Sequence, residues 1–191
     1  MITNTQSGTN VHEIAPGIYR INTPVTLPGD MKFNFNQYLI VDDAPMLFHT
    51  GLRQLFPVVS EAIRAVMPLE RLRYVGLSHF EADECGALNQ FLAAAPQAIP
   101  VASRVAAMVS LGDYADRAPR ALADGELLSL GHHTIKWFDT PHMPHAWECG
   151  LMLDVTTRTF FNGDLFTQGG SGEVALTDAD ILGPSERFRQ P

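Results

Sequence analysis

A short apolar run that stops abruptly at a polar loop is the feature that most constrains how this chain can fold. Residues 72–77 (LRYVGL) have the composition of a buried strand, and polar side chains begin at Ser78 and His79. Residues 86–95 (GALNQFLAAA) then carry apolar side chains at helical spacing. The sequence therefore predicts a strand, a polar loop over 79–85 and a helix. Folds that alternate strands and helices usually build their sites at such strand ends.

The remaining patterns predict strands near both ends of the chain, with helices between them. Expected strands lie at 11–25 (two, around the turn pair Pro16-Gly17), 37–41, 45–49, 99–102, 125–130, 134–139, 150–155 and 159–162. Further helices are expected at 55–66 and 105–111, and a loop at 27–35. Clear periodicity is lost after the glycine-rich residues 169–172, so an irregular tail is expected over about 173–191. The fold class is therefore α/β, with a single domain over residues 1–191.

Composition narrows the classes of protein that this chain can represent. Its 191 residues are 46% hydrophobic and 18% charged, the balance of a globular protein with one core. A net charge of −8 without a dense basic run argues against a nucleic-acid partner. No stretch approaches the roughly 20 apolar residues that span a membrane, and the N-terminal residues lack an apolar signal core. A cytoplasmic protein without a membrane partner is expected.

Candidate metal ligands are concentrated in the polar loop and just beyond two later strands. His79, Glu81 and Asp83 occupy alternate positions, which point to one side of an extended chain. Acidic loops are commonly only solvated, so this pattern alone is a weak indication. His145 and Asp164 strengthen it, because each follows a predicted strand.

The order of these five residues resembles that of a known superfamily. Asp83 and His145 are separated by 61 residues, and His145 and Asp164 by 18. This pattern resembles the metallo-β-lactamase superfamily, and within it the diiron domain of flavodiiron proteins and the stand-alone oxygen-binding diiron proteins. Glu81 sets the branch, because the hydrolases usually carry a second histidine there, which suits zinc. The resemblance covers residues 37 to about 183 and implies a four-layer αββα sandwich whose second half is incomplete, in a chain that stops short at its C-terminal end.

The resemblance also implies roles and chemistry. His79, Glu81 and His145 would hold a first iron, Asp164 would bridge, and Asp83 would belong to a second iron. A bridging carboxylate lowers the repulsion between two nearby cations. The implied function is to bind or reduce O2, or nitric oxide, as an oxidoreductase that takes electrons from an external donor. No FMN domain is expected in this chain, and a homodimer is implied.

Two departures from the family pattern concern the second metal. Glu84 stands where the superfamily usually has a histidine, and no histidine follows Asp164. The second position could then have Asp83, Asp164 and Glu84, which are all oxygen donors and suit a hard ion. That position is therefore empty, or its last ligand comes from a missing segment or from a partner, and the chain holds either two irons or one.

Other histidines have alternative interpretations. His142 could replace His145 as the ligand, although Pro141 and Pro144 prevent a helix that would place both histidines on one face. His49 ends a predicted strand and could either hydrogen-bond a ligand carboxylate or be a buried core histidine. The remaining pair in the middle of the chain, His132 and His133, follows a glycine and is expected to be exposed.

Two other functions stay open at this stage. A metal-dependent hydrolase would use zinc or manganese to lower the pKa of a bound water to about 7 and would act on a small-molecule substrate. A non-catalytic sensor of O2 or redox state would keep the fold with a degenerate second metal site.

Overall fold

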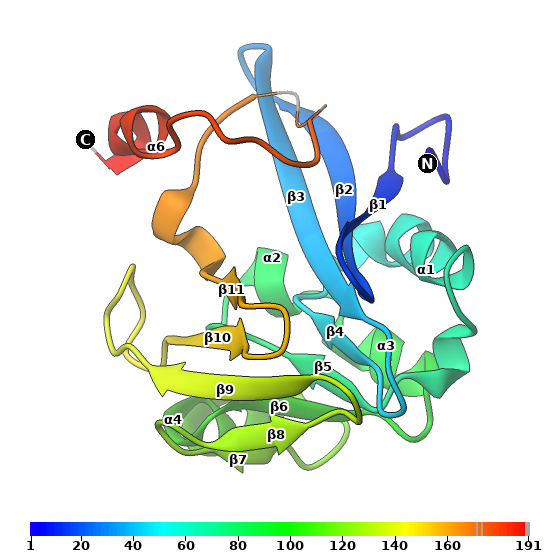
Figure 1. Ribbon diagram of the computed structural model, residues 1–191, viewed down its shortest axis with the longest axis vertical. Helices are drawn as coiled ribbons and strands as arrows, with labels where there is room; N and C mark the ends of the chain where they lie inside the picture. The colour runs from blue at the N-terminus through cyan, green and yellow to red at the C-terminus, as the bar shows by residue number, and fades with distance from the viewer. Residues whose placement is uncertain (171, 173, 190–191) are drawn as a thin grey trace.

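The computed structural model describes residues 1–170, 172 and 174–189. Two β-sheets face each other, and helices cover the outer side of the larger sheet (Figure 1). No helix in the described part of the chain is long and apolar enough to cross a membrane.

The larger sheet contains seven strands in sequence order. They are β1 (Asn10–Ala15), β2 (Ile18–Leu27), β3 (Met31–Ile40), β4 (Met46–Phe48), β5 (Tyr74–Gly76), β6 (Ile99–Ser103) and β7 (Arg120–Leu122). Strands β1 to β4 pair antiparallel, whereas β4 to β7 pair parallel. The parallel strands bring several carboxyl ends to one edge of the sheet, where α/β folds place their sites.

The smaller sheet is an antiparallel meander in the order β11-β10-β9-β8. Its strands are β8 (Leu127–Ser129), β9 (Thr134–Asp139), β10 (Gly150–Asp154) and β11 (Thr159–Phe161). Strand β10 pairs antiparallel with β9 on one side and with β11 on the other.

The helices are short and lie mainly between strands of the larger sheet. They are α1 (Phe56–Arg64), α2 (Ala82–Cys85), α3 (Leu88–Ala94), α4 (Arg104–Ala106), α5 (Gly112–Tyr114) and α6 (Leu182–Arg189). Helical turns complete the set: η1 (Arg53–Leu55), η2 (Leu69–Arg71), η3 (Ala107–Leu111) and η4 (Gly163–Phe166). Pro57 falls in the first turn of α1, where its missing N–H costs no helical hydrogen bond.

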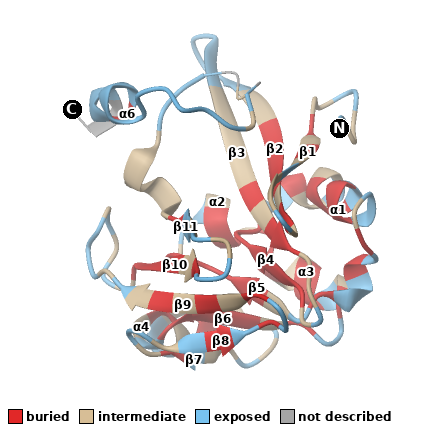
Figure 2. Ribbon diagram, in the orientation of Figure 1, coloured by how far each residue is buried: buried red, intermediate tan, exposed pale blue. Residues whose placement is uncertain are grey.

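Side chains along the strands of the larger sheet point alternately to its two faces and contribute to two separate hydrophobic cores. One face packs on α1 and α3, and Leu39 and Leu47 belong to that core. The other face packs on the smaller sheet, where Ile40 and Phe48 meet Trp137. Figure 2 shows that the buried residues gather in the central strands of both sheets. Successive side chains of a strand point to opposite faces, so one strand serves both cores.

The described residues form three layers, in the order helices, larger sheet, smaller sheet. On the outer face of the smaller sheet, Leu127 is 59% exposed and Phe160 is 45% exposed, and no helix of the described part covers them. The expected αββα sandwich with an incomplete second half is therefore confirmed.

Most expected elements are present, including the antiparallel pairing of 37–41 with 45–49. The expected loop over 27–35 is wrong, because β2 and β3 continue through it as a long hairpin. The expected irregular tail is wrong for Leu182–Arg189, which form α6. Residues 173, 190 and 191 of that expected tail lie outside the described residues.

Candidate metal centre

The buried half of the candidate centre comes from the edge where β4 and β5 end. His49 directly follows β4, and Ser78 and His79 follow β5 after Leu77. His79 is 1% exposed. Its loop ends at Glu81, which precedes α2 in an extended conformation. The change from strand to helix thus sets His79 and Glu81 side by side at the edge of the larger sheet.

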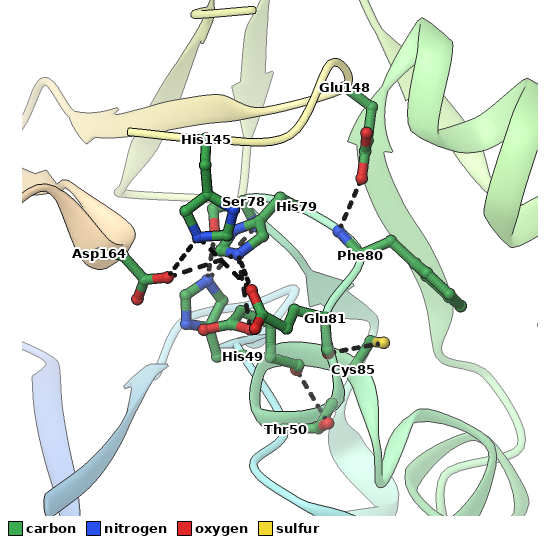
Figure 3. A network of polar contacts seen from close by, with 11 residues as sticks. His49, Thr50, Ser78, His79, Phe80, Glu81, Cys85, His145, Glu148 and Asp164 are labelled. Atoms are coloured by element: carbon green, nitrogen blue, oxygen red, sulfur yellow. Dashed lines mark hydrogen bonds and ion pairs between the residues drawn. The ribbon is translucent and has the colours of Figure 1, made fainter. Parts of the chain in front are cut away.

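The exposed half comes from the smaller sheet. His145 lies in the loop between β9 and β10, and Asp164 lies in η4, just after β11. Two hydrogen bonds hold the first of these segments against the loop that carries His79. The Gly150 N–H donates to the Ser78 carbonyl at 2.8 Å, and the Phe80 N–H donates to the Glu148 carboxylate at 3.1 Å. Both sheets therefore contribute side chains to one candidate centre (Figure 3).

Two imidazole nitrogens and two carboxylate oxygens converge between the sheets. His79 Nε2 lies 3.1 Å from Glu81 Oε2 and 3.4 Å from Asp164 Oδ2. His145 Nε2 lies 3.4 Å from Glu81 Oε2 and 3.1 Å from Asp164 Oδ2. All four donor atoms lie within 4.8 Å of one another. Mixed nitrogen and oxygen donors at this spacing fit one divalent transition metal.

One side of this four-donor group is open to solvent. The Glu81 and His145 side chains are 50% and 49% exposed, and that of Asp164 is 31% exposed. His79 is fully enclosed and anchors the group. An ion bound here would keep a position free for a small molecule, which distinguishes a reactive metal site from a closed structural site.

A hydrogen-bonded chain behind His79 fixes which ring nitrogen carries its proton. The Ser78 N–H donates to His49 Nε2 at 3.3 Å, so that nitrogen is an acceptor. The Ser78 hydroxyl lies 2.8 Å from the same nitrogen and 2.8 Å from His79 Nδ1. The hydroxyl therefore donates to His49 and accepts from the His79 Nδ1–H. This assignment leaves the lone pair of His79 Nε2 free to bind a metal.

Burial of His49 supports this direction of donation. Desolvation lowers the pKa of His49 to about 3, and the nearby His79 ring adds a smaller effect in the same sense. The His49 ring is consequently neutral at physiological pH and can accept a hydrogen bond. It stacks on Phe48 with ring centroids 4.2 Å apart.

A second, acidic group adjoins the four-donor group. Oxygen atoms of Glu81, Asp83 and Glu84 lie within 4.8 Å of one another. Glu84 is only 3% exposed. Burial raises its pKa to about 10, and the charges of Asp164 and Asp83 add to that effect. Glu84 is therefore protonated at physiological pH, which lowers the negative charge of the acidic group.

Two cavities reach this region from different sides. A cavity of about 630 Å³ is lined by Asp83, Glu84 and Asp164 together with residues of β2, β3 and the segment after η4. Another of about 810 Å³ is lined by Glu81 and by Phe80 and Tyr114, among others. The centre is therefore reachable by small molecules.

The structure brings together most of the site residues predicted from the sequence. His79, Glu81, His145 and Asp164 form the four-donor group, and Asp83 and Glu84 form the acidic group with Glu81. His142 does not belong to either group; it is exposed, and its backbone N–H donates to the Ala146 carbonyl in a turn. Of the two possibilities left open for His49, the structure shows the buried histidine, whose ring accepts a hydrogen bond from the backbone N–H of Ser78 and contacts the Ser78 hydroxyl.

Two residues that position this centre were not predicted from the sequence. Ser78 joins the two histidines, and Glu148 holds the loop at Phe80 through its side chain. The sequence feature that could have identified Ser78 is its hydroxyl side chain, which stands directly before His79 at the end of a predicted strand. Glu148 had no comparable signal, because its contact spans 68 positions of the chain.

Comparison with known proteins gives a consistent result. Residues 33–182 match the model of a family described as ODP family beta lactamase. A rubredoxin-oxygen oxidoreductase of Megalodesulfovibrio gigas is 27% identical over 150 residues, which are 78% of this chain and 37% of that protein. The chain thus spans well under half of the length of that relative.

Two solved structures share the fold. The metal-soaked flavodiiron core from Synechocystis superimposes with a TM-score of 0.81 at 21% identity, covering 94% of this chain and 48% of that one. The flavodiiron protein of Giardia intestinalis gives 0.80 at 18% identity, covering 94% and 47%. The resemblance inferred from the ligand order is thereby confirmed. Because the family model matches more than half of its residues, this chain belongs to the ODP family of beta-lactamase-fold proteins.

Proposed function

We propose that this protein holds non-haem iron at His79, Glu81, His145 and Asp164 and uses it to bind or reduce O2. The observation that carries the proposal is the four-donor group itself, in which two nitrogens and two oxygens lie within 4.8 Å and one side is open. The names of the relatives support the same chemistry, since they include a rubredoxin-oxygen oxidoreductase and flavodiiron proteins.

The donor set favours iron over zinc. Catalytic zinc sites usually combine several histidines with at most one carboxylate, whereas this group pairs two histidines with two carboxylates. The acidic group beside it makes the surroundings still richer in oxygen donors. Harder, oxygen-rich surroundings suit iron or manganese better than zinc.

When bound, ferrous iron supplies a centre that can coordinate O2 and pass electrons to it. The residues of the chain prepare this centre. Ser78 holds His79 in the tautomer that exposes Nε2, because the buried His49 accepts the Ser78 hydroxyl hydrogen and the hydroxyl oxygen is left to accept from the His79 Nδ1–H. Glu81 and His145 sit at the open side, where a small molecule would arrive. As an oxidoreductase the protein would take its electrons from an external donor, and we propose that it acts as a homodimer.

Metal analysis combined with spectroscopy tests the proposal. Protein produced in iron-supplemented medium is expected to contain iron. The absorption spectrum of the anaerobically reduced form is expected to change when O2 is added. Tightly bound zinc without any O2-dependent spectral change would contradict the proposal and would favour a hydrolase.

A pair of histidine variants tests the site at residue level. His145→Ala should lose the metal, because it removes one of the two nitrogen donors. His142→Ala is the matched control from the same loop and should keep it, since His142 lies outside both groups. Metal content by elemental analysis distinguishes the two. Loss in His142→Ala with retention in His145→Ala would reverse the assignment.

A further inference from the structure

The cavity beside Phe80 has the size and the walls of a site for a small molecule. It measures about 810 Å³ and is lined by residues of η1, by Pro57 of α1, by parts of the segment 80–86, and by Gln90 and Tyr114. Ligand sites in proteins usually measure roughly 300–1,000 Å³. Figure 3 shows that the Phe80 side chain points away from the side chains of the four-donor group, so this cavity is a separate space.

One wall of this cavity is aromatic. The Phe80 and Tyr114 rings meet edge to face, with their centroids 5.1 Å apart. Tyr114 is 38% exposed, so this pair leaves ring surface uncovered. Leu52 and Pro57 add apolar surface to the lining. Aromatic rings attract one another in offset or edge-to-face contacts, so this wall favours a planar aromatic ligand.

The polar side chains of the cavity are not engaged by the rest of the described chain. The exposed Arg53 makes no ion pair and no hydrogen bond through its guanidinium with any described residue. The side-chain oxygen of Gln90 is enclosed and also lacks a partner in the described part of the chain, which is uncommon for a buried polar atom. Burial raises the pKa of Tyr114, and the Arg53 charge opposes that shift, which places the guanidinium near the phenol ring.

The charges on the lining select the sign of the ligand. Among the described residues that line the cavity, Arg53 is the one basic residue and Glu81 the one acidic residue. The whole chain has a net charge of −8, which repels anions in general, so an anion bound here depends on the local cation. A guanidinium can hold a carboxylate or a phosphate with two parallel hydrogen bonds.

We propose that this cavity binds a small planar aromatic molecule that carries one anionic group. The anionic group pairs with Arg53, and the ring lies against Phe80 and Tyr114. Because Glu81 also lines the cavity, the bound molecule lies close to the four-donor group without being a ligand of its metal. The inference goes beyond the proposed function, since this site requires no metal.

Isothermal titration calorimetry of the full chain with 2-naphthoate tests the site. Wild-type protein should bind one molecule per chain. Arg53→Gln should weaken this binding at least about tenfold, because the charge-assisted hydrogen bonds are lost. Arg64→Gln is the matched control, since it removes the same charge from an exposed position of α1 outside the cavity, and it should bind as the wild type does.

Related probes separate the charge from the ring. 2-Naphthol has the same ring without the charge and should bind the wild type at least about tenfold more weakly than 2-naphthoate. 2-Naphthyl phosphate keeps a negative charge and should bind, and whichever anion binds more tightly indicates whether the natural ligand is a carboxylate or a phosphate. Tyr114→Leu should weaken the binding of 2-naphthoate, whereas Tyr114→Phe, which keeps the ring, should not.

The outcomes separate this inference from the proposed function. His145→Ala should still bind 2-naphthoate, because His145 does not line the cavity. Binding that is lost in His145→Ala but kept in Arg53→Gln would show that the carboxylate coordinates the metal instead, and would overturn the proposal. Equal binding of 2-naphthoate by wild type and Arg53→Gln, or no binding of either anion by the wild type, also overturns it. Circular dichroism of each variant checks that it is folded.

Discussion

At the scale of single residues, Ser78 supports the candidate centre through both its hydroxyl and its backbone carbonyl. Its hydroxyl lies between two histidines, and its carbonyl accepts the first hydrogen bond of β10. One residue thus orients a ligand and also fixes the smaller sheet against the larger.

Ser78→Ala should weaken metal binding about 10- to 100-fold, because the His79 Nδ1–H loses its acceptor and the ring is held less firmly. Competition with a chelator of known affinity measures the effect. Ser60→Ala, which removes another buried serine hydroxyl within α1, is the control and should leave affinity unchanged. Equal affinity in both variants would show that the hydroxyl does not position His79.

Asp42, which precedes β4, also makes several contacts with a single side chain. Its carboxylate accepts hydrogen bonds from the backbone N–H groups of Asp43, His132 and His133. This contact joins the turn before β4 to the turn between β8 and β9. His133 was expected to be exposed, but it is 7% exposed and bonds Asp154 at 3.0 Å. A tertiary contact between two turns is invisible in a local pattern.

Because of Asp42, the free energy of unfolding should decrease when the pH falls into the acid range. Desolvation raises its pKa, but the hydrogen bonds from His133, His132 and Asp43 outweigh this and lower the pKa from 3.8 to about 2. The stabilisation is complete above pH 3.8 and is lost as pH falls through about 2. Its size is about 2 kcal/mol.

Urea unfolding at pH 7 and at lower pH checks this prediction. Asp42→Asn should lower the free energy of unfolding at pH 7 by about 2 kcal/mol, and the difference from wild type should shrink as pH approaches 2. Asp43→Asn, at the neighbouring exposed position, should change it by less. A pH-independent difference for Asp42→Asn would exclude ionisation as the cause.

At the scale of elements, the start of β10 is where the core and the metal centre meet. Gly150 donates to the Ser78 carbonyl, and a Cβ at this position would overlap the Trp137 ring of β9. Only glycine lets β10 approach both neighbours.

Gly150→Ala should therefore destabilise the fold by about 1–3 kcal/mol through overpacking, and should also weaken metal binding. Gly76→Ala in β5 is the comparison, because its Cβ would meet Phe48 at 3.2 Å, where a small shift suffices. Thermal unfolding and metal affinity, measured on both variants, give the two readouts. If Gly76→Ala costs as much stability as Gly150→Ala, the Trp137 overlap is not the cause.

The long hairpin of β2 and β3 is the element that the sequence predicts least well. The expected loop is confined to a short turn at residues 28–30, and ten residue pairs extend from it in regular register. Residues 31–36 (MKFNFN) alternate apolar and polar side chains at the period of a strand, so the expected loop over 27–35 overlooked a strand signal. The side chains of Arg20 and Asn34 donate hydrogen bonds to the backbone carbonyls of Gly170, Gly172 and Val174 and hold these residues against the hairpin. Polar contacts of this kind do not produce a periodic pattern in the sequence.

At the scale of the whole molecule, the candidate centre joins the two sheets. His79 and Glu81 belong to the larger sheet, and His145 and Asp164 to the smaller. A metal that binds this folded arrangement, and not the unfolded chain, stabilises the fold by mass action.

Saturating metal should raise the unfolding temperature. At a free concentration of about 100 times Kd, the gain is roughly 2.7 kcal/mol, or roughly 5–10 °C for a chain of this size. Differential scanning calorimetry with and without Zn²⁺ measures it. His145→Ala should show little shift under the same conditions, and a shift as large as that of the wild type would place the stabilising ion elsewhere.

The sequence predicts the layers and the ligand order, but not the contacts that join distant segments. Apolar periodicity located α1, β9 and the β10–β11 hairpin, because each buries one face regardless of its partner. The candidate ligands that lie together in the structure were picked from the sequence because a metal site requires a few residue types at strand ends. The strand β7 and the support from Ser78 and Glu148 depend on neighbours far along the chain, and local patterns do not encode those neighbours.

Because the candidate ligands lie on two sheets, the order of folding determines when a metal ion could bind. The loop of His79 can form with β5 and α2, but the four donors assemble only after β9, β10 and β11 have docked across the inter-sheet core. An ion bound by all four donors would therefore bind only after these strands have docked. A bound ion at this centre would therefore indicate that the two sheets of that chain have docked. A chain whose sheets are docked incorrectly would not bind the ion.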